Sequence, residues 1–522
     1  MNIGSLLSQS ARKFPEFPAI QCEGRCYSYR QFNEEVNRFA HGLLGQGVNK
    51  GDRLALMMKN SDHFVFTFFA AAKIGAVAVP INFRLTATEV QYILEQSDAA
   101  IVVCDKEFEQ LIAEAEQGTS IRMVITVGEP ETAGFYSYEK VLSDNRDEPA
   151  IEVSEKDDVE ILYTSGTTGR PKGALFDHSQ IFKVGISVVI SMEISQQERI
   201  LHLAPLFHSA QLNLFLISGV ALGATHIIHR DFHPVKTLQA IQEHKITHLF
   251  AVPAMYTFLL QVPNAAEYDL SSIKRVGYGA APMAPELVKK SMQLFKTDQF
   301  YNLCGLTEAG PGGILLDPEG HKLHLGKGGK PIFMTETRVV NEEGKDVLPG
   351  VIGEFILRSP MVMKEYYKKP DETKSTLKNG WLYTGDLATI DEEGYITLVD
   401  RKKDMIISGG ENVYSVEVEG VLYEHPAVLE AAIIGLPDEV WGEAVCAIIV
   451  PKEGAVIDEQ ELRSFCREKL AGYKVPRRIF IEQQLPRNAS GKILKYQLRQ
   501  KMNQMSGEKN NRSTSSTESE VI

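Results

Sequence analysis

The sequence has little positive charge for its length. It carries 55 Lys and Arg residues against 68 Asp and Glu residues, which gives a formal net charge of −13. Nucleic-acid backbones bind basic surfaces, so this balance argues against a general nucleic-acid-binding protein. A local basic patch could still hold a small anionic ligand. We therefore expect small-molecule ligands and no nucleic-acid partner.

Cysteine is also sparse. There are six cysteines in 522 residues, and only Cys22 and Cys26 are close in sequence, on either side of a predicted hairpin turn. A structural zinc site needs a further Cys or His pair nearby, and none follows these two. Few cysteines are typical of a reducing compartment, so the sequence predicts a cytoplasmic protein.

Long hydrophobic runs are missing as well. Residues 1–13 lack a basic region followed by an apolar core, so we expect a short amphipathic helix there and no signal peptide. The most apolar segment, 64–80, is interrupted by Lys73 and Gly75 and is short for a membrane span. It predicts a buried helix that leads into a strand at 76–79, and no transmembrane segment.

Strand-like and helical runs alternate along most of the chain. With 43% hydrophobic and 24% charged residues, the composition is ordinary for a globular protein, and the length calls for two or more domains. The alternation predicts parallel sheets covered by helices, an α/β class. The expected strands are 53–57, 100–103, 123–126 and 248–252, and the expected helices are 29–44, 87–97 and 234–243.

The composition changes near residue 400. Beyond it the pattern predicts a compact α+β region with helices at 415–425 and 458–470 and strands at 431–436 and 444–450. The stretch 503–522 is rich in Ser, Thr, Asn and Glu and has no apolar period, so we expect a disordered tail.

The most informative motif is Tyr163-Thr-Ser-Gly-Thr-Thr-Gly-Arg-Pro-Lys-Gly173. Its glycines allow backbone N–H groups to approach an anion, its hydroxyls donate hydrogen bonds, and Lys172 supplies positive charge. The Gly-Lys-Ser/Thr ending of a Walker loop is absent. The string resembles the phosphate loop of the adenylate-forming enzymes, the acyl-CoA synthetases and their relatives.

Further motifs follow in the order of that family. Gly277-Tyr-Gly-Ala-Ala-Pro282 comes after an apolar strand, and Pro282 at the third glycine position speaks against a dinucleotide fingerprint. Tyr301–Gly310 contains Gly-Leu-Thr-Glu, Trp381–Asp386 ends in Tyr-Thr-Gly-Asp, and residues 485–492 read Leu-Pro-Arg-Asn-Ala-Ser-Gly-Lys. The resemblance covers about residues 1–500.

The resemblance implies a role for each motif. It places Thr307 at the α-phosphate and Glu308 at Mg²⁺ together with Thr164, and Mg²⁺ needs few protein ligands. Lys492 corresponds to the lysine that stabilises charge during adenylation. The implied nucleotide-binding residues are Thr164, Ser165, Gly166, Thr167, Thr168, Gly169 and Lys172 at the phosphates, Gly279, Ala280, Ala281, Pro282 and Asn302 at adenine, and Asp386 and Arg401 at the ribose.

The second half-reaction has its own implied residues. Lys403 is the expected hinge, although the segment 401–404 also reads as a charged linker. Gly409, Gly410 and Glu411 are expected to line the thiol tunnel. Trp441 matches a tryptophan that contacts the CoA nucleotide in aryl-CoA ligases, with a buried tryptophan as the alternative. His208 is expected to gate the acyl pocket, with structural packing as the alternative.

One position departs from the family pattern. Cys304 stands where relatives usually carry an aromatic residue that stacks on adenine. Either nucleotide affinity is weaker, or Tyr301 or Tyr278 takes over the stacking.

The resemblance implies a large N-terminal α/β domain of several subdomains (1–400), a hinge (401–404) and a small mobile α+β C-terminal domain (405–502), before the tail (503–522). The expected reaction joins ATP and a carboxylic acid into acyl-AMP and pyrophosphate, after which coenzyme A gives acyl-CoA and AMP. The expected cofactors are therefore ATP, Mg²⁺ and CoA. The oligomeric state stays open, with a homodimer as one alternative.

The sequence defines the identity of the carboxylic acid substrate less well than it defines the reaction. The candidate pocket residues contain no basic side chain, which favours a medium- or long-chain fatty acid, with an aromatic acid of the benzoate or cinnamate type close behind. Alternatives for the whole reaction are transfer to a separate carrier protein, a luciferase-like oxygenase and a weakly active ligand sensor. The candidate pocket residues are Phe207, His208, Gln211, Gly279, Gly305, Pro311, Gly312 and Gly313.

Overall fold

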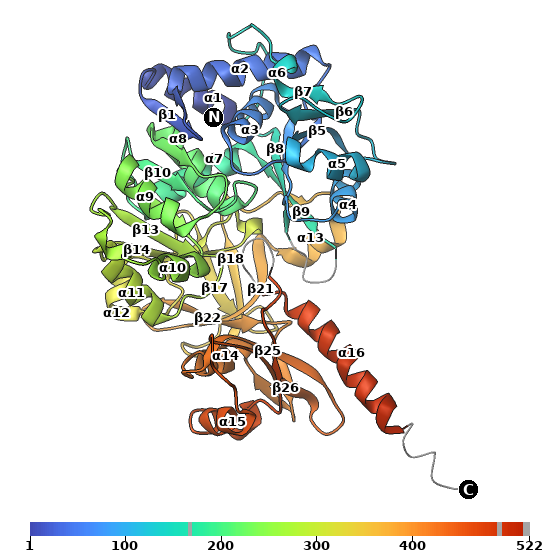
Figure 1. The fold of residues 1–522 in the computed structure, drawn as a ribbon, viewed down its shortest axis with the longest axis vertical. Coiled ribbons are helices and arrows are strands. Elements are labelled where there is room, and N and C mark those ends of the chain that lie inside the picture. The colour runs from blue at the N-terminus through green and yellow to red at the C-terminus, as the bar shows by residue number, and fades with distance from the viewer. Residues whose placement is uncertain (165–169, 488–492, 515–522) are drawn as a thin grey trace. The chain divides into compact units, whose positions relative to one another are not determined.

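The computed structural model describes residues 1–164, 170–487 and 493–514. The chain forms two compact units (Figure 1). The larger unit contains Met1–Thr337 and Ile356–Tyr383, and the smaller contains Arg338–Phe355 and the chain from Thr384 onward. The predicted domain boundary at residue 400 therefore falls inside the smaller unit, and the hinge at 401–404 stays a prediction.

A nine-stranded sheet, sheet A, forms one half of the larger unit. Its strand order is β16-β15-β14-β13-β12-β10-β11-β1-β2, and the strands from β14 to β1 run parallel. Helices connect most of the parallel strands, as the alternating pattern predicts. Its strands are β1 (Pro18–Cys22), β2 (Arg25–Ser28), β10 (Arg199–His202), β11 (Thr225–Ile228), β12 (His248–Ala251), β13 (Arg275–Gly279), β14 (Phe300–Gly305), β15 (Gly313–Leu316) and β16 (Lys330–Pro331).

An eight-stranded sheet, sheet B, forms the other half. Its order is β19-β9-β8-β4-β3-β5-β6-β7, parallel from β8 to β7 and antiparallel at β8-β9-β19. Its strands are β3 (Arg53–Met57), β4 (Val77–Pro80), β5 (Ala99–Asp105), β6 (Met123–Val127), β7 (Tyr136–Ser137), β8 (Asp158–Thr164), β9 (Lys172–Asp177) and β19 (Glu365–Tyr366).

The helices of the larger unit begin at clear sequence signals. Helix α2 starts after Ser28 and helix α4 after Thr86, each with a capping box in which the cap hydroxyl and a side chain three residues later bond reciprocally. The segment predicted as a buried helix is α3, which ends at Gly75 with φ +73°. The helices are α1 (Ile3–Lys13), α2 (Tyr29–Gly45), α3 (Asp62–Ile74), α4 (Ala87–Ser97), α5 (Glu109–Ala115), α6 (Tyr138–Val141), α7 (His178–Ser191), α8 (Ile217–Leu222), α9 (Pro234–His244), α10 (Pro253–Leu260), α11 (Pro285–Phe295), α12 (Pro318–His324) and α13 (Pro370–Thr376).

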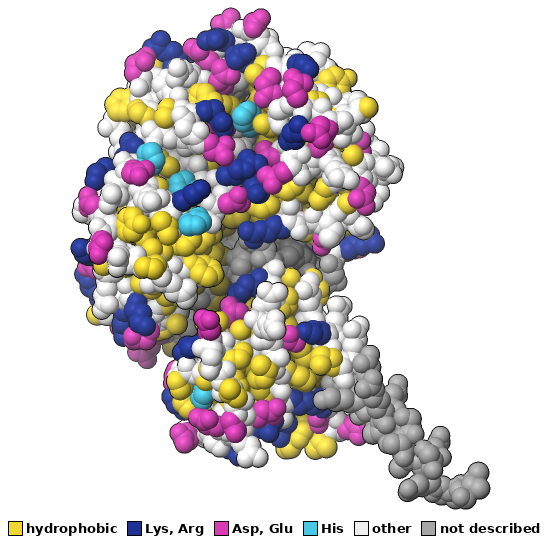
Figure 2. Space-filling view, in the orientation of Figure 1, with side chains coloured by type: hydrophobic (Ala, Val, Ile, Leu, Met, Phe, Trp, Pro, Cys, Tyr) yellow, Lys and Arg dark blue, Asp and Glu magenta, His cyan; other side chains and the backbone are white. Residues whose placement is uncertain are grey.

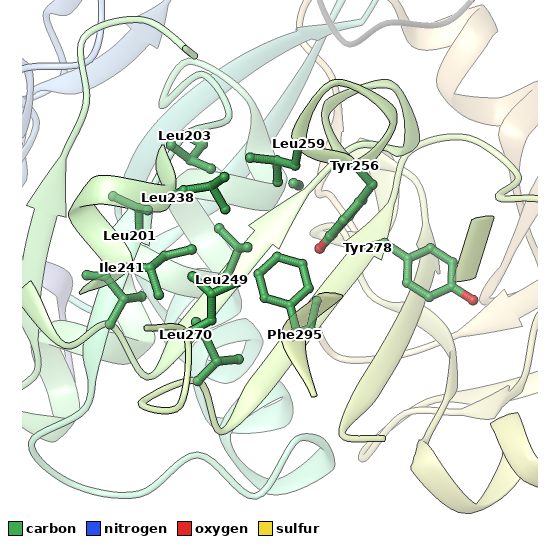
Figure 3. Close-up of a cluster of buried hydrophobic side chains, with 14 of the residues drawn as sticks. Leu201, Leu203, Leu238, Ile241, Leu249, Tyr256, Leu259, Leu270, Tyr278 and Phe295 are labelled. Atoms are coloured by element: carbon green, nitrogen blue, oxygen red, sulfur yellow. The ribbon is translucent and has the colours of Figure 1, made fainter. Parts of the chain in front are cut away.

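The core on one face of sheet A packs against α9, α10 and α11 (Figure 3). Leu201 and Leu249 point from neighbouring strands toward Tyr256 and Phe295, and all four side chains are fully buried. Burying an aliphatic or aromatic side chain of this size contributes about 2 kcal/mol. This packing holds the sheet rigid, so that the loops at the carboxyl ends of its parallel strands have defined positions.

The smaller unit contains an antiparallel sheet, β24-β23-β26-β25, to which β27 adds in parallel with β26. Its predicted helices and strands are present, with small shifts of their ends. Its elements are β23 (Ile406–Ser408), β24 (Glu411–Val413), α14 (Ser415–Tyr423), β25 (Val428–Asp438), β26 (Gly442–Pro451), α15 (Glu459–Arg467), β27 (Arg478–Ile481) and α16 (Lys495–Thr514). Strands β17 (Glu336–Val340), β18 (Gly353–Arg358), β20 (Leu377–Lys378), β21 (Trp381–Ile390) and β22 (Ile396–Arg401) form a further sheet.

The sequence predicts a disordered tail from residue 503, whereas the described chain continues as helix α16 to Thr514. Leu498 and Met502 bury the start of this helix against β25 and β26. Residues 515–522 lie outside the described part of the chain.

Acidic and basic side chains are interspersed on the face of the larger unit that Figure 2 shows. Among the described residues, no helix combines the length and the apolar character that crossing a membrane requires.

Candidate active site

The phosphate-loop motif joins two paired strands. Strand β8 ends at Thr164 and β9 begins at Lys172, and these two residues are direct partners in the antiparallel register. The residues between them that the motif assigns to phosphate binding, Ser165, Gly166, Thr167, Thr168 and Gly169, lie outside the described residues. The hairpin therefore fixes both ends of the loop, and it leaves Thr164 and Lys172 beside each other.

Glu308 is the centre of a polar cluster at the end of this hairpin. Its carboxylate accepts a hydrogen bond from the Tyr366 hydroxyl at 2.7 Å and one from the Thr164 hydroxyl at 3.4 Å. The Lys172 ammonium lies over the Tyr366 ring, 4.2 Å from its centroid. One carboxylate, two hydroxyls and one ammonium group thus converge here from β8, β9, β19 and the segment after β14.

The backbone around Glu308 needs glycine at two places. A side chain at Gly305 would come within 2.0 Å of the Pro311 carbonyl oxygen, and Gly310 has φ +84°. This tight turn contains Thr307 and Glu308 in a 3₁₀ helix, η4 (Thr307–Ala309). The Met363 N–H donates to the Glu308 carbonyl at 2.8 Å, which ties the turn to the strand region of Tyr366.

The segment predicted to contact adenine is also at a strand end. Strand β13 ends at Gly279, where a side chain would lie 2.3 Å from the Leu303 carbonyl oxygen. Ala280 follows with φ +66°, an uncommon conformation for a residue with a side chain, and Ala281 and Pro282 continue toward α11. On neighbouring β14, Asn302 donates to the Lys327 carbonyl at 3.4 Å.

Both tyrosines proposed to replace the missing aromatic residue are packed in the core. Tyr278 is 2% exposed, belongs to the cluster of Figure 3, and forms a 3.0 Å hydrogen bond with the His321 ring. Tyr301 is 4% exposed and packs with Phe215 and Phe250 in another core cluster. Alternation along β13 and β14 turns both rings into the core, and adenine stacking by either tyrosine stays a prediction.

His208 lies in the loop that follows β10. Asn60 fastens this loop: its amide oxygen accepts from the Leu206 N–H at 2.7 Å, and its amide nitrogen donates to the Ala204 carbonyl at 3.0 Å. The next residue, Ser209, shares a 3.4 Å hydrogen bond with the Thr307 hydroxyl. The residue that follows the predicted gate residue is therefore hydrogen-bonded to the Thr307–Glu308 turn.

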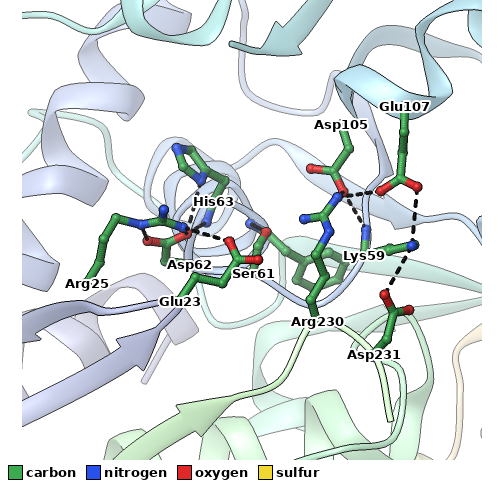
Figure 4. Close-up of polar contacts among 11 residues, drawn as sticks. Glu23, Arg25, Lys59, Ser61, Asp62, His63, Asp105, Glu107, Arg230 and Asp231 are labelled. Carbon is green, nitrogen blue, oxygen red and sulfur yellow. Dashed lines mark hydrogen bonds and ion pairs between the residues drawn. The ribbon is translucent and has the colours of Figure 1, made fainter. Parts of the chain in front are cut away.

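Charged networks hold the β3–α3 segment that contains Asn60 (Figure 4). On one side Lys59 pairs with Glu107 and Asp231 at 3.2 and 3.1 Å. On the other side Asp62, fully buried, pairs with Arg25 at 2.6 Å. These pairs set the position of Asn60 from both sides.

Asp386 and Arg401 are neighbours in the smaller unit. They face each other in the β21–β22 register, and the arginine Nε lies 3.1 Å from the carboxylate. Lys402 donates its N–H to the Gly385 carbonyl at 2.9 Å, and the exposed Lys403 follows in a turn. The ribose and hinge roles of Asp386, Arg401 and Lys403 stay predictions.

Trp441 is not buried. It is 37% exposed, and the Arg477 guanidinium stacks on its ring, 3.8 Å from the centroid. Gly409, with φ +63°, donates its N–H to the Trp441 carbonyl at 2.8 Å, and a side chain there would meet the indole at 2.8 Å. Gly410 and Glu411 complete the exposed turn, so the tryptophan, arginine and glycine turn form one surface. Lys492 lies outside the described residues.

The donor set at Glu308 fits Mg²⁺. This ion prefers carboxylate and hydroxyl oxygens and keeps several waters, so it needs only one or two protein ligands. Glu308 and Thr164 supply such oxygens within 3.4 Å of each other. Bound there, the ion would neutralise phosphate charge beside Lys172.

Comparison with known proteins decides the family. The sequence model of AMP-binding enzymes matches residues 7–367, and that of the AMP-binding enzyme C-terminal domain matches residues 417–492. The chain belongs to the AMP-binding enzyme family. The prediction of an adenylate-forming enzyme with this two-part α/β fold is thereby confirmed. The protein is an AMP-forming acid–CoA ligase.

The similarity to individual members of the AMP-binding enzyme family extends over nearly the whole chain. The sequence is 37% identical to a feruloyl-CoA synthase of Amycolatopsis (96% of this chain, 99% of the relative). It is 38% identical to the long-chain-fatty-acid–CoA ligase FadD13 of Mycobacterium tuberculosis (96% and 98%). The fold is similar to that of the o-succinylbenzoate CoA synthetase of Bacillus subtilis in complex with its acyl-adenylate, with a TM-score of 0.85, 32% identity and coverage of 94% and 97%.

Proposed function

We propose that this ligase activates an apolar monocarboxylic acid, namely a medium- or long-chain fatty acid, with ATP and Mg²⁺. It then transfers the acyl group to coenzyme A, in the cytoplasm. Acyl-AMP and pyrophosphate form first, and the CoA thiol then displaces AMP. In this scheme Lys172 and Lys492 neutralise phosphate charge, while Asp386 orients the ribose. Catalysis is mainly positioning and electrostatic stabilisation.

The cluster at Glu308 carries the proposal for the first step. A carboxylate beside a hydroxyl and an ammonium group is a combination that suits a metal-bound triphosphate: Glu308 and Thr164 would hold the metal, and Lys172 would neutralise phosphate charge. Tyr366 orients Glu308 and lies beneath Lys172. If Glu308 and Lys172 had only a structural role, the phosphate-loop hairpin beside them would be left without a function.

The surroundings of the glycine turn at 309–313 support an apolar acid. Additional atoms at Gly312 would touch the Met361 and Ile332 side chains at 3.1 and 3.2 Å, and Gly310 lies against Val184. Ala309 is fully buried beside them. A second carboxylate on the substrate would have no cation among the candidate pocket residues, so its desolvation would be uncompensated.

The second candidate substrate is an aromatic acid. The 37% identity to a feruloyl-CoA synthase over nearly the full chain favours it. The exposure of Trp441 also favours it, because this residue matches a tryptophan that contacts the CoA nucleotide in aryl-CoA ligases. The similarity to FadD13 is of the same size and favours the fatty acid.

Mass spectrometry of products tests both proposals. The purified protein is incubated with Mg-ATP, CoA and equal concentrations of dodecanoate, palmitate, benzoate and ferulate. Predominant fatty acyl-CoA supports the first candidate, and predominant aryl-CoA supports the second. Acyl-AMP without any acyl-CoA points to a carrier-protein acceptor, and oxygen consumption with a substrate points to a luciferase-like oxygenase. Nucleotide binding without any product supports a ligand sensor.

A further inference from the structure

A chain of buried polar side chains closes the base of the loop that contains His208. The Gln211 amide nitrogen lies 2.6 Å from His202 Nδ1, and His202 Nε2 lies 2.9 Å from His226 Nδ1. All three side chains are fully buried. His202 is the last residue of β10 and Gln211 lies just after the loop, so this one hydrogen bond joins the two ends of the segment 203–210.

The segment after the loop has an unusual backbone. Residues Ala210–Leu216 form a π-helical turn, η2, before α8. π-helical turns are rare in proteins, and many of those that occur lie at functional sites. Gln211 ties η2 to sheet A through His202, while Asn213 ties it to sheet B by a 2.7 Å hydrogen bond to Glu160 on β8. The turn that follows His208 is therefore fastened to both sheets of the larger unit.

The direction of the hydrogen bonds requires neutral imidazoles. With the Gln211 amide donating, His202 Nδ1 is an acceptor, its Nε2 carries the proton, and His226 Nδ1 accepts in turn. Burial holds the pKa of His202 well below its usual range and lowers the pKa of His226 to about 3. If His202 were protonated, its Nδ1–H would face the Gln211 amide N–H, and two hydrogen-bond donors would oppose each other.

Polar side chains cost more to bury here than apolar side chains would. Among the described residues, Gln211 Oε1, Asn213 Oδ1 and His226 Nε2 are buried without a hydrogen-bond partner. An unsatisfied buried polar atom costs roughly 1–3 kcal/mol, and apolar residues of the same shape would avoid that cost. What the chain does provide is a fixed geometry between β10, η2 and the loop that they enclose.

We propose that His202 and Gln211 are positioning residues for the acid-activation step: their hydrogen bond sets the place of His208 and of Ser209, which contacts Thr307. Asn60 holds the middle of the same loop, and the His202–Gln211 bond holds its two ends. Breaking the bond frees the loop at its base and moves the acid relative to the phosphates. The inference rests on the proposed function; it gives Gln211, a candidate pocket residue, a positioning role and adds His202, which the sequence did not indicate.

The test compares steady-state constants of acid-dependent ATP–pyrophosphate exchange in the full chain. Gln211→Met keeps the length of the side chain without the amide, and His202→Phe keeps a ring without nitrogens. Each is expected to raise the KM for the acid about tenfold while the KM for ATP changes less than twofold, since small displacements of a positioned substrate have effects of this size. The double variant is expected to be no worse than either single variant, because both remove the same bond.

A control and a rescue separate positioning from folding. Tyr29→Phe removes another fully buried hydrogen bond, from the Tyr29 hydroxyl to the Ala224 carbonyl at 2.7 Å. It is expected to lower the Tm without changing the KM for the acid. His202→Asn, which can both accept and donate, is expected to recover part of the loss.

Two results would overturn the inference. One is an unchanged KM for the acid in both single variants, whatever happens to the Tm. The other is a double variant whose losses add, which would mean that the two residues act separately. If the wild-type protein shows no exchange with any acid while it binds ATP, the proposed function itself fails, and that outcome is recognised before any variant is measured.

Discussion

The Tyr366 hydroxyl donates a 2.7 Å hydrogen bond to the Glu308 carboxylate, and the same tyrosine ring lies under the Lys172 ammonium. Fifty-eight residues separate the two partners in sequence. Tyr366 belongs to none of the family motifs, so the sequence did not indicate it. The buried ring organises the two charged groups that the proposed function assigns to Mg²⁺ and phosphate.

Tyr366→Phe should slow adenylation about tenfold at limiting Mg²⁺. The charged Glu308 carboxylate loses the hydrogen bond that the Tyr366 hydroxyl donates, while the ring under Lys172 remains. Pyrophosphate exchange as a function of Mg²⁺ concentration measures the effect. Tyr367→Phe is the matched control, since its hydroxyl contacts Asp98 at 3.2 Å, outside the Glu308 cluster. Equal rates for the two variants would contradict the role of Tyr366.

Glu160→Gln should make the protein more stable at alkaline pH. Burial raises the pKa of Glu160 to about 8, so the native state keeps a proton that the unfolded chain loses near its ordinary value of about 4.5. The preference of the native state for protonated Glu160 contributes fully to the free energy of unfolding below pH 4.5. This contribution is lost as the pH rises from there through about 8. The difference in Tm between variant and wild type should therefore grow from pH 6 to pH 9, and a constant difference would contradict the shifted pKa.

Cys304→Tyr should lower the KM for ATP several-fold. Tyr278 and Tyr301 are both packed in the core, so a ring at position 304 is expected to add stacking on adenine, and a stacked base contributes about 1 kcal/mol or more. ATP binding by calorimetry gives the same comparison without turnover. Cys304→Leu, apolar but not aromatic, separates stacking from size, and an equal gain in both variants would count against stacking.

Lys492→Ala should abolish acyl-AMP formation and spare the transfer of supplied acyl-AMP to CoA. The lysine is expected to stabilise charge only in the first step. Separate assays of the two half-reactions measure this. Equal loss of both steps would argue against the assigned role.

Lys403→Pro should give the opposite result. Proline fixes φ, so the variant should still form acyl-AMP but should lose thioester formation if the C-terminal domain rotates about this residue. Lys402→Ala, one position earlier, removes a charge without restricting the backbone and is the control. Undiminished acyl-CoA output from Lys403→Pro would show that the hinge lies elsewhere.

Local signals in the sequence predicted much of the fold. The strand 53–57 and the helix 87–97 are present with the predicted limits, because an apolar period and a capping box depend only on neighbouring residues. Helix α16 is harder to predict from composition, because its start is held by the packing of Leu498 and Met502 against distant strands.

The sequence by itself determined the chemical class of this protein. Its motifs required glycines, hydroxyls and lysines in a fixed order, and a phosphate loop is a local arrangement of backbone and side chains. Tertiary structure alone decided which residues support that chemistry. Sheets A and B bring distant strand ends together, and this places Tyr366, Asn60 and His202 at or beside the site. Long-range contacts of this kind produce no characteristic spacing of residues in the sequence.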